Sequence, residues 1–417
     1  MDDEPDRPGD RRRSKVLFFA EAVTLAHVAR PLALAKGLEL GRYEVAFASA
    51  PRYEALWGDL RSRVRPIHSI SGAQFVDALA RGHPLYTAAT LRSYVEEDLE
   101  AIREVRPDVI VGDFRLSLSV SARLAGIPYL TITNAYWSPY ARQRFPLPEL
   151  LIVRRLGLPL AGALFAASRP LAFALHTIPL NRIRREYGLP SLGTDLRRTY
   201  TDADMTLYAD VPEMVPTFGL PPNHRYLGPI VWSPEARLPA WWDGLDPQRP
   251  MVYVTMGSSG RADLLSAVLE GLADLPVVVI AATLGRSLDR PAPPNALVAD
   301  FLPGHAAAAR ADMVVCNGGS PTTHQALAAG VPVLGIPSNM DQHLNMQSVR
   351  RLGAGESIRS DRASAGAVRR AVDRILGDPR YTDEAARLAG IFSKYDAVAR
   401  FLAIVDGLIR NQNNSGV

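Results

Sequence analysis

The sequence is poor in cysteine. Cys316 is the only cysteine among 417 residues. A single thiol excludes an intramolecular disulfide and a thiolate metal site, and it is typical of a protein in a reducing cytoplasm. The opening charged segment is followed only by the short apolar run VLFFA, so no signal peptide is predicted. We therefore expect a cytoplasmic protein.

A long uninterrupted hydrophobic run is also missing. The most lipophilic region, 147–180, is interrupted by five residues: Arg154, Arg155, Pro159, Arg169 and Pro170. It lacks the roughly 20 continuous apolar residues that a membrane span requires. We expect helices that line an apolar cleft or lie against a membrane surface, so a peripheral membrane contact stays open.

Outside the first residues, neither positive nor negative charges are in clear excess. The formal net charge is +4, and the opening MDDEPDRPGDRRRSK holds a dense mixture of charges with proline and glycine. This composition predicts a disordered tail over 1–14. The remaining chain is close to neutral, which argues against a nucleic-acid-binding surface.

The sequence offers no convincing metal site. Asp202 and Asp204 have an Asp-x-Asp spacing that can hold a divalent cation, but no acidic or histidine cluster accompanies them. They precede the strand-like run MTLYAD and are interpreted as solvated residues. No metal and no other cofactor is expected.

Short apolar runs alternate with helical patterns in two blocks. The first contains KVLFFA, YEVAFAS, PDVIVGDF and IPYLTIT, and the second contains PMVYVTMG, VVVIAAT, DMVVC and VPVLGIP. Uninterrupted apolar strands separated by helices predict parallel sheets covered on both faces. We predict an α/β protein with two doubly wound, Rossmann-like lobes facing across a cleft: 15–230, a proline-rich linker over 231–248, and 249–394.

A glycine turn in the second block is the most informative motif. The strand MVVC runs into Asn317, Gly318 and Gly319, and Ser320 stands where a helix N-cap is expected. Free amides and the positive end of a helix dipole suit a diphosphate, and the hydroxyls of Ser320, Thr322 and Thr323 would add hydrogen bonds. The alternative is an ordinary strand–turn–helix connection.

The same stretch resembles the donor-binding signature of the UDP-glycosyltransferase superfamily, which includes plant natural-product and bacterial antibiotic and macrolide glycosyltransferases. The matching positions are Gly318, Gly319, Ala329, Gly330, Val331, Pro332, Pro337, Asp341, Gln342 and Asn345. The resemblance implies the GT-B fold, metal-independent transfer with inversion, and contacts from Asp341 and Gln342 to the sugar hydroxyls. It also implies that a helix over 395–411 packs back on the first lobe. Asn317 replaces the histidine that the family usually has.

Two further segments agree with this resemblance. VTMGSSG is similar to the first strand and loop of the family's donor lobe, which implies that Gly257, Ser258 and Ser259 face the diphosphate. ADFLPGH resembles the segment that places an aromatic residue against the donor base, and Phe301 has that position. Core packing is the alternative for Phe301.

Transfer of a sugar to a hydroxyl needs a base, and histidine suits this task near neutral pH. His27 follows the first strand, and His27, Val28 and Pro31 match the family's Gly-His-Val-x-Pro pattern, with Ala26 in the glycine position. Asp113 ends the strand PDVIVGD and matches the family's partner aspartate. We predict His27 as the general base and Asp113 as the residue that orients it. A surface histidine and a helix cap are the alternatives.

The predicted partners are a UDP- or dTDP-sugar donor and a small or lipid-like acceptor, bound near Tyr136, Trp137 and Phe145. These aromatic residues are equally compatible with core packing. Two other functions remain open: a nucleotide-sugar 2-epimerase-like isomerase of the same fold, and a catalytically silent sugar-nucleotide-binding protein.

Overall fold

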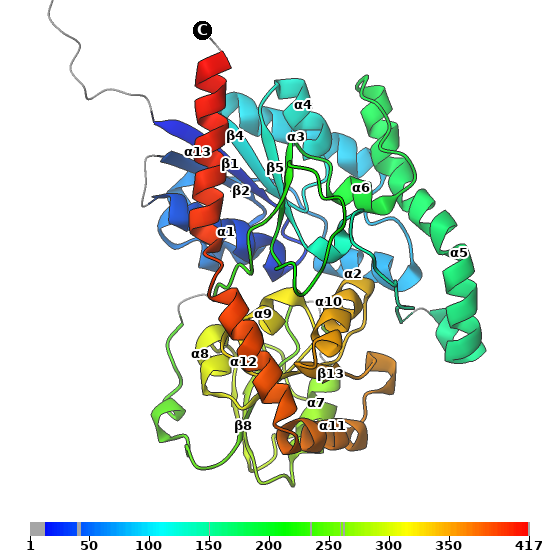
Figure 1. Cartoon of the computed structure of the whole chain (residues 1–417), viewed down its shortest axis with the longest axis vertical. Coiled ribbons are helices and arrows are strands. Elements are labelled where there is room, and N and C mark those ends of the chain that lie inside the picture. The colour runs from blue at the N-terminus through cyan, green and yellow to red at the C-terminus, as the bar shows by residue number, and fades with distance from the viewer. Residues whose placement is uncertain are drawn as a thin grey trace, which may run out of the picture.

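The computed structural model describes residues 13–39, 43–149, 151–233, 236–258, 260–261 and 263–415. Most of the tail predicted over 1–14 lies outside these residues. Ser14 is an exception, because the first strand begins there. Figure 1 shows two lobes, one above the other, each with a sheet between helices.

The N-terminal lobe is built on a seven-stranded parallel sheet in the order β3-β2-β1-β4-β5-β6-β7. Its central strands are buried on both faces, which explains their continuous runs of Val, Ile, Leu and Phe. The strands are β1 (Ser14–Ala20), β2 (Tyr43–Ser49), β3 (Val64–Pro66), β4 (Val109–Asp113), β5 (Tyr129–Thr133), β6 (Met205–Tyr208) and β7 (His224–Tyr226).

Helices cover both faces of this sheet. One core contains residues of α1 and α13, and the cores on the other side contain residues of α3 and α4. The helices of the lobe are α1 (Leu25–Glu39), α2 (Gly72–Arg81), α3 (Ala88–Val105), α4 (Leu118–Ala125), α5 (Leu151–Glu186), α6 (Leu196–Tyr200) and α13 (Ala397–Ser415). The last of these returns from the other lobe to pack on α1.

The C-terminal lobe has a six-stranded parallel sheet in the order β10-β9-β8-β11-β12-β13. Its strands are β8 (Met251–Thr255), β9 (Val278–Ala282), β10 (Ala296–Ala299), β11 (Met313–Cys316), β12 (Val333–Gly335) and β13 (Gly355–Ser357). Its helices are α7 (Leu264–Leu272), α8 (Gly304–Arg310), α9 (Ser320–Ala328), α10 (Met340–Arg351), α11 (Ala365–Gly377) and α12 (Arg380–Phe392). The predicted α/β class with two doubly wound lobes is confirmed.

Short 3₁₀ segments complete the described elements: η1 (Pro51–Leu56), η2 (Gly58–Arg63), η3 (Ala135–Trp137), η4 (Trp242–Gly244) and η5 (Ser360–Arg362). The cores of the lobes are continuous across their boundary, because Ala135, Tyr136 and Tyr208 join the cluster under α9, α10 and α12. The chain crosses between lobes a second time before α13. At that place Gly228 (φ 97°) lies against Tyr395, and a Cβ on Gly228 would be 2.4 Å from the tyrosine Cβ.

Candidate active site

The chemistry-bearing residues of both lobes follow the carboxyl ends of parallel strands. In the N-terminal lobe Asp113 ends β4, Asn134 follows β5 and Asp210 follows β6, and these strands are neighbours in the sheet. In the C-terminal lobe the 317–319 turn follows β11. Carboxyl ends of parallel strands meet at one edge of a sheet, so each lobe presents one such edge to the other.

His27 and Asp113 are in contact, as the predicted pair requires. His27 is the third residue of α1, and its Nδ1 lies 2.8 Å from Asp113 Oδ1. The carboxylate of Asp113 is fully buried, whereas the imidazole remains partly exposed. An Nδ1–H that donates to the carboxylate leaves Nε2 as the basic nitrogen, which suits a histidine that accepts a proton.

Arg30 is a site residue that the sequence analysis missed. Its Nε donates to Asp113 Oδ2 and one terminal nitrogen donates to Asp113 Oδ1, both at 2.8 Å. This is a bidentate, charge-assisted pair that fixes the carboxylate plane. Although burial disfavours a charged guanidinium, the adjacent Asp113 raises the pKa of Arg30. The available signal was its place one helical turn after His27, on the same face of α1.

The ring of Phe114 packs against one face of the His27 imidazole. The two rings are stacked, with 4.5 Å between centroids and 9° between planes. Phe114 has a positive φ of 61°, which L-residues rarely adopt and which costs on the order of 1 kcal/mol. His27 is therefore fixed by a hydrogen bond at its edge and by an aromatic ring on its face.

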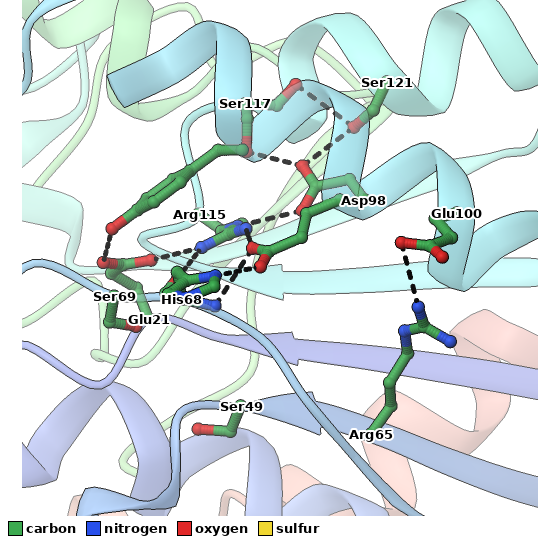
Figure 2. Close-up of polar contacts among 12 residues, drawn as sticks. Glu21, Ser49, Arg65, His68, Ser69, Asp98, Glu100, Arg115, Ser117 and Ser121 are labelled. Carbon is green, nitrogen blue, oxygen red and sulfur yellow. Dashed lines mark hydrogen bonds and ion pairs between the residues drawn. The ribbon is translucent and has the colours of Figure 1, made fainter. Parts of the chain in front are cut away.

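A buried ion cluster anchors the strained turn that carries Phe114. The next residue, Arg115, is fully buried and donates to Glu21 at 3.1 Å and to Asp98 at 2.9 Å (Figure 2). Its guanidinium also lies over the Tyr94 ring. Burial raises the pKa of Glu21 and of Asp98, while Arg115 opposes this change. The cluster joins the ends of β1 and β4 behind the histidine.

A polar network continues from the pair into the other lobe. Arg30 donates to Asn134 Oδ1 at 2.7 Å, and Ser320 of α9 donates to the same oxygen at 3.3 Å. Asn134 Nδ2 in turn donates to Asp210 at 3.1 Å, and Asp210 lies 3.5 Å from His324 Nε2. The predicted base and the start of the predicted donor helix are therefore linked through Asn134.

The glycine turn differs in detail from the expectation. Gly319 and not Ser320 is the N-cap of α9, because Ser320 already has helical geometry and turns its hydroxyl to the other lobe. Thr323 was expected to face phosphate, but it is fully buried and donates back to the carbonyls of Gly319 and Ser320. Asn317 Oδ1 accepts the Gly319 amide at 3.0 Å.

Two features of this turn remain compatible with an anion. Gly318 adopts φ 78°, and a Cβ there would be 2.6 Å from Met346, so only glycine fits. The N-cap of α9, Gly319, has no side chain to cap the helix, so the N-cap residue itself does not neutralise the positive end of the helix. Thr322 is half-buried in the first turn.

The loop after β8 reaches the other lobe. Gly257 adopts φ 61°, and Ser258 Oγ accepts the amide of Leu25 at 3.2 Å, two residues before His27. Ser259 lies outside the described residues. Phe301 is half-buried between β10 and α8. These placements leave the predicted roles of Gly257, Ser258 and Phe301 as predictions.

Asp341 and Gln342 lie in the first turn of α10 at the lobe boundary, and their side chains have different hydrogen-bond partners. Asp341 Oδ1 accepts the indole Nε1–H of Trp137 at 2.9 Å. Gln342 is buried, and its Oε1 accepts the Ser338 amide at 2.8 Å. The amide oxygen of Gln342 thus closes the turn before α10, which differs from the sugar contact expected of it.

An aromatic row extends from His27 to α5. It consists of five rings in sequence, Phe114, Tyr200, Trp137, Phe145 and Phe173, with successive centroids 5.0–6.0 Å apart. Trp137 and Phe145, two of the predicted acceptor residues, belong to this row. Tyr136 does not: it is fully buried, and its hydroxyl makes no hydrogen bond within the described part of the chain.

No group of three or more potential metal-ligating side chains occurs within the described part of the chain. Asp202 pairs with Arg123 at 2.8 Å and with Arg184 at 2.7 Å, and Asp204 accepts the Tyr129 amide at 2.8 Å. Both aspartates are therefore structural. The interpretation of Asp202 as simply solvated is wrong, because its two arginine partners enclose it.

Comparison with known proteins gives consistent results. The family described as "Erythromycin biosynthesis protein CIII-like, C-terminal domain" matches residues 266–393. A "PGL/p-HBAD biosynthesis glycosyltransferase" of Mycobacterium tuberculosis is 55% identical over 91% of this chain and 89% of its own length. A "PGL/p-HBAD biosynthesis rhamnosyltransferase" of Mycobacterium bovis is 56% identical over 92% and 85%.

Solved structures agree on the fold. Spinosyn rhamnosyltransferase SpnG superimposes with a TM-score of 0.70 at 20% identity, covering 94% of this chain and all of its own. The relatives establish the activity class, and the structural likeness establishes the two-lobed architecture. The chain belongs to the GT-B, UDP-glycosyltransferase-like superfamily and is a glycosyltransferase.

Proposed function

We propose that this glycosyltransferase moves a sugar from a nucleoside diphosphate to a hydroxyl of an aromatic or lipid-like acceptor, with inversion at the anomeric carbon. His27 Nε2 accepts the acceptor proton, the acceptor oxygen attacks the anomeric carbon, and the nucleoside diphosphate leaves. The observation that carries this proposal is the His27–Asp113 contact of 2.8 Å at the lobe boundary. The buried Asp113 stabilises the imidazolium that forms.

The leaving group is assigned to the turn between β11 and α9. The uncapped helix start favours a negative charge, and backbone amides act without a metal. Asn317 is neutral, so donor binding relies on these dipoles more than on a side-chain charge. A UDP- or dTDP-sugar is the proposed donor. SpnG has been solved in complex with thymidine diphosphate, which favours a dTDP-sugar as the first probe.

The acceptor is assigned to the aromatic row, because Phe114 touches the imidazole and the other rings extend away from it. Flat aromatic side chains offer stacking surface to a phenolic or other aromatic alcohol. A narrow cavity lined by Phe114, Thr133 and Tyr200 lies beside the inner end of the row.

Nucleotide release from dTDP-rhamnose and UDP-glucose, with and without a water-soluble phenol, tests the proposal. A transferase releases nucleotide faster with the phenol, and the anomeric carbon of the product has the opposite configuration to that of the donor sugar. An epimerase changes the donor sugar regardless of the phenol. A silent binding protein is stabilised by the donor against thermal unfolding but releases no nucleotide. Either of the last two results would refute the proposal.

A further inference from the structure

Helix α5 presents an apolar face that no other part of the described chain covers. Five side chains are 47–65% exposed, and they are Leu160, Leu164, Leu171, Leu175 and Ile178. At about 100° per residue, these positions fall within an arc of roughly 60° on one side of the helix. We name them the leucine stripe. It extends for roughly 27 Å at 1.5 Å per residue, and α5 lies along the outer edge of the molecule (Figure 1).

This face does not belong to a core helix. The segment Leu156–Glu186 is long and apolar enough to cross a membrane by length and composition, yet only 6% of its most apolar window is buried. Isolated exposed leucines are ordinary, but a continuous stripe marks a contact surface. The stripe therefore requires an occupant.

The helix cannot cross a bilayer without unfolding its own lobe. Leu180 and Ile183 are buried against the N-terminal lobe, and Arg184 pairs with Asp202 at 2.7 Å. Pro170 and Arg169 lie in the middle of the apolar segment. The geometry allows α5 to lie along a membrane surface, with its leucine stripe outward and its other side attached to the lobe.

The charges near the stripe are complementary to an anionic surface. Helix α5 contains six arginines, of which Arg184 is buried against Asp202 and Arg169 packs on the rings of Phe145 and Phe173. Its single acidic residue, Glu186, accepts hydrogen bonds from Arg92 and Arg182. Arg182 and Arg185 are exposed just beyond the stripe. Exposed arginines that flank an uncharged apolar face are typical of helices that bind acidic lipid headgroups.

The aromatic row connects helix α5 with the catalytic pair. Phe173 is on α5, and its ring meets Phe145 at 5.0 Å with the guanidinium of Arg169 over both rings. From Phe145 the row passes through Trp137 to the rings beside His27. At about 100° per residue, Phe173 lies on the side of α5 opposite to the leucine stripe. One end of the row is therefore at the lobe-facing side of α5 and the other is at the predicted base.

We propose that the leucine stripe docks the protein on an anionic lipid bilayer, so that the aromatic row receives an acceptor that resides in that bilayer. The docking depends only on α5. The delivery of the acceptor rests on the function proposed above.

Co-sedimentation with vesicles tests the docking without any turnover. The full chain is mixed with vesicles of phosphatidylcholine and phosphatidylglycerol, or of phosphatidylcholine alone. We expect it to pellet with the acidic vesicles and to be released at high salt. The triple variant Leu160→Ser, Leu171→Ser, Leu175→Ser should bind at least about tenfold less, because each leucine contributes apolar area to the contact.

A matched control replaces three exposed apolar residues elsewhere: Val76→Ser, Leu124→Ser and Leu238→Ser. This variant should pellet like the original protein. The proposal is overturned if the original protein stays in the supernatant or if the leucine-stripe variant still pellets. It is also overturned if light scattering shows that the stripe variant only converts a dimer to a monomer.

Transfer to the water-soluble phenol separates this proposal from the function. The leucine-stripe variant should keep this transfer and the thermal shift with dTDP-rhamnose, since neither needs a bilayer. Vesicle binding without any transfer by the original protein would retain the docking and refute the function. Transfer without vesicle binding would do the reverse.

Discussion

The indole Nε1 of Trp137 donates a 2.9 Å hydrogen bond to Asp341 Oδ1, across the boundary between the lobes. Trp137 belongs to the aromatic row of the N-terminal lobe, and Asp341 is in the first turn of α10 in the C-terminal lobe. One bond therefore joins the proposed acceptor wall to the residue that family resemblance assigns to the donor sugar.

Trp137→Phe should increase affinity for the donor. The substitution keeps an aromatic ring in the row but removes the N–H, so the sugar hydroxyls no longer compete with it for the carboxylate. A hydrogen bond to a charged group contributes about 1.5–3 kcal/mol, part of which is regained from solvent, so we expect about three- to tenfold tighter binding. Titration calorimetry with dTDP-rhamnose measures this affinity. Phe145→Leu, which leaves Asp341 untouched, is the control, and weaker binding by Trp137→Phe would contradict the assignment.

His27→Ala and Asp341→Ala should separate chemistry from donor binding. Loss of a general base lowers kcat by about 10²–10⁴, whereas the donor site is unchanged, so the thermal shift with dTDP-rhamnose should persist in His27→Ala. Asp341→Ala should lose much of that shift. His305→Ala changes an exposed histidine and serves as the control. Full turnover by His27→Ala would show that the base lies elsewhere.

Arg30→Met should move the pH dependence of transfer. Without the guanidinium, the charge of Asp113 is no longer balanced, so a protonated His27 is stabilised. As the pH is lowered, the rate of transfer should therefore begin to decrease at a higher pH than in the original protein. Arg30→Lys, which keeps a charge but not the bidentate geometry, should restore much of the profile. A purely structural role would lower the rate equally at every pH, and that result would exclude the positioning role.

Arg115→Met should destabilise the fold in a pH-dependent way. Removing one partner from a buried ion cluster costs about 3–5 kcal/mol, because the charges of Glu21 and Asp98 are left buried. Burial already raises the pKa of both carboxyls, so in the variant the folded state binds more protons than the unfolded state. Its stability is then fully present at low pH and is lost as pH rises. Urea unfolding should show a larger loss at about pH 8 than at about pH 5; equal losses would contradict this.

His224 should contribute to acid instability. Burial lowers the pKa of its imidazole from 6.5 to about 4. Between pH 6.5 and about pH 4, His224 binds a proton in the unfolded chain but not in the folded chain. The free energy of unfolding therefore decreases as the pH is lowered through this range, by up to about 3 kcal/mol. His224→Phe should flatten the unfolding free energy between these pH values. An unchanged slope would assign the acid sensitivity to other groups.

Much of the fold was accessible from the sequence. Apolar runs such as VVVIAAT and DMVVC have the continuous hydrophobicity of strands buried on both faces, and they form β9 and β11. His27 and Asp113 were found because they match the family's Gly-His-Val-x-Pro pattern and its partner aspartate, and because each follows or ends a strand, where parallel sheets collect functional residues. Their contact could be inferred because β1 and β4 are neighbours in a doubly wound sheet.

The details that sequence reasoning missed are set by tertiary contacts. The spacing of Arg30 from His27 puts both on one face of α1, but only the tertiary structure shows that Arg30 contacts Asp113 and Asn134. Phe114 resembles any residue after a strand, because its positive φ is visible only in coordinates. Ser320 looked like an N-cap by residue type, but the N-cap is one residue earlier, at Gly319, and Ser320 is the first residue of the helix.

The close packing of Gly228 on Tyr395 places both chain crossings between the lobes at one point. Two covalent connections that touch each other form a pivot, so rotation of the lobes about it moves the far side most. Gly228 would then scarcely shift, whereas the hydrogen bond from Trp137 to Asp341, which joins the two lobes, would have to break. Such a rotation would also have to part the apolar core that Ala135, Tyr136 and Tyr208 share with the C-terminal lobe, so opening the boundary exposes apolar surface as well as polar groups.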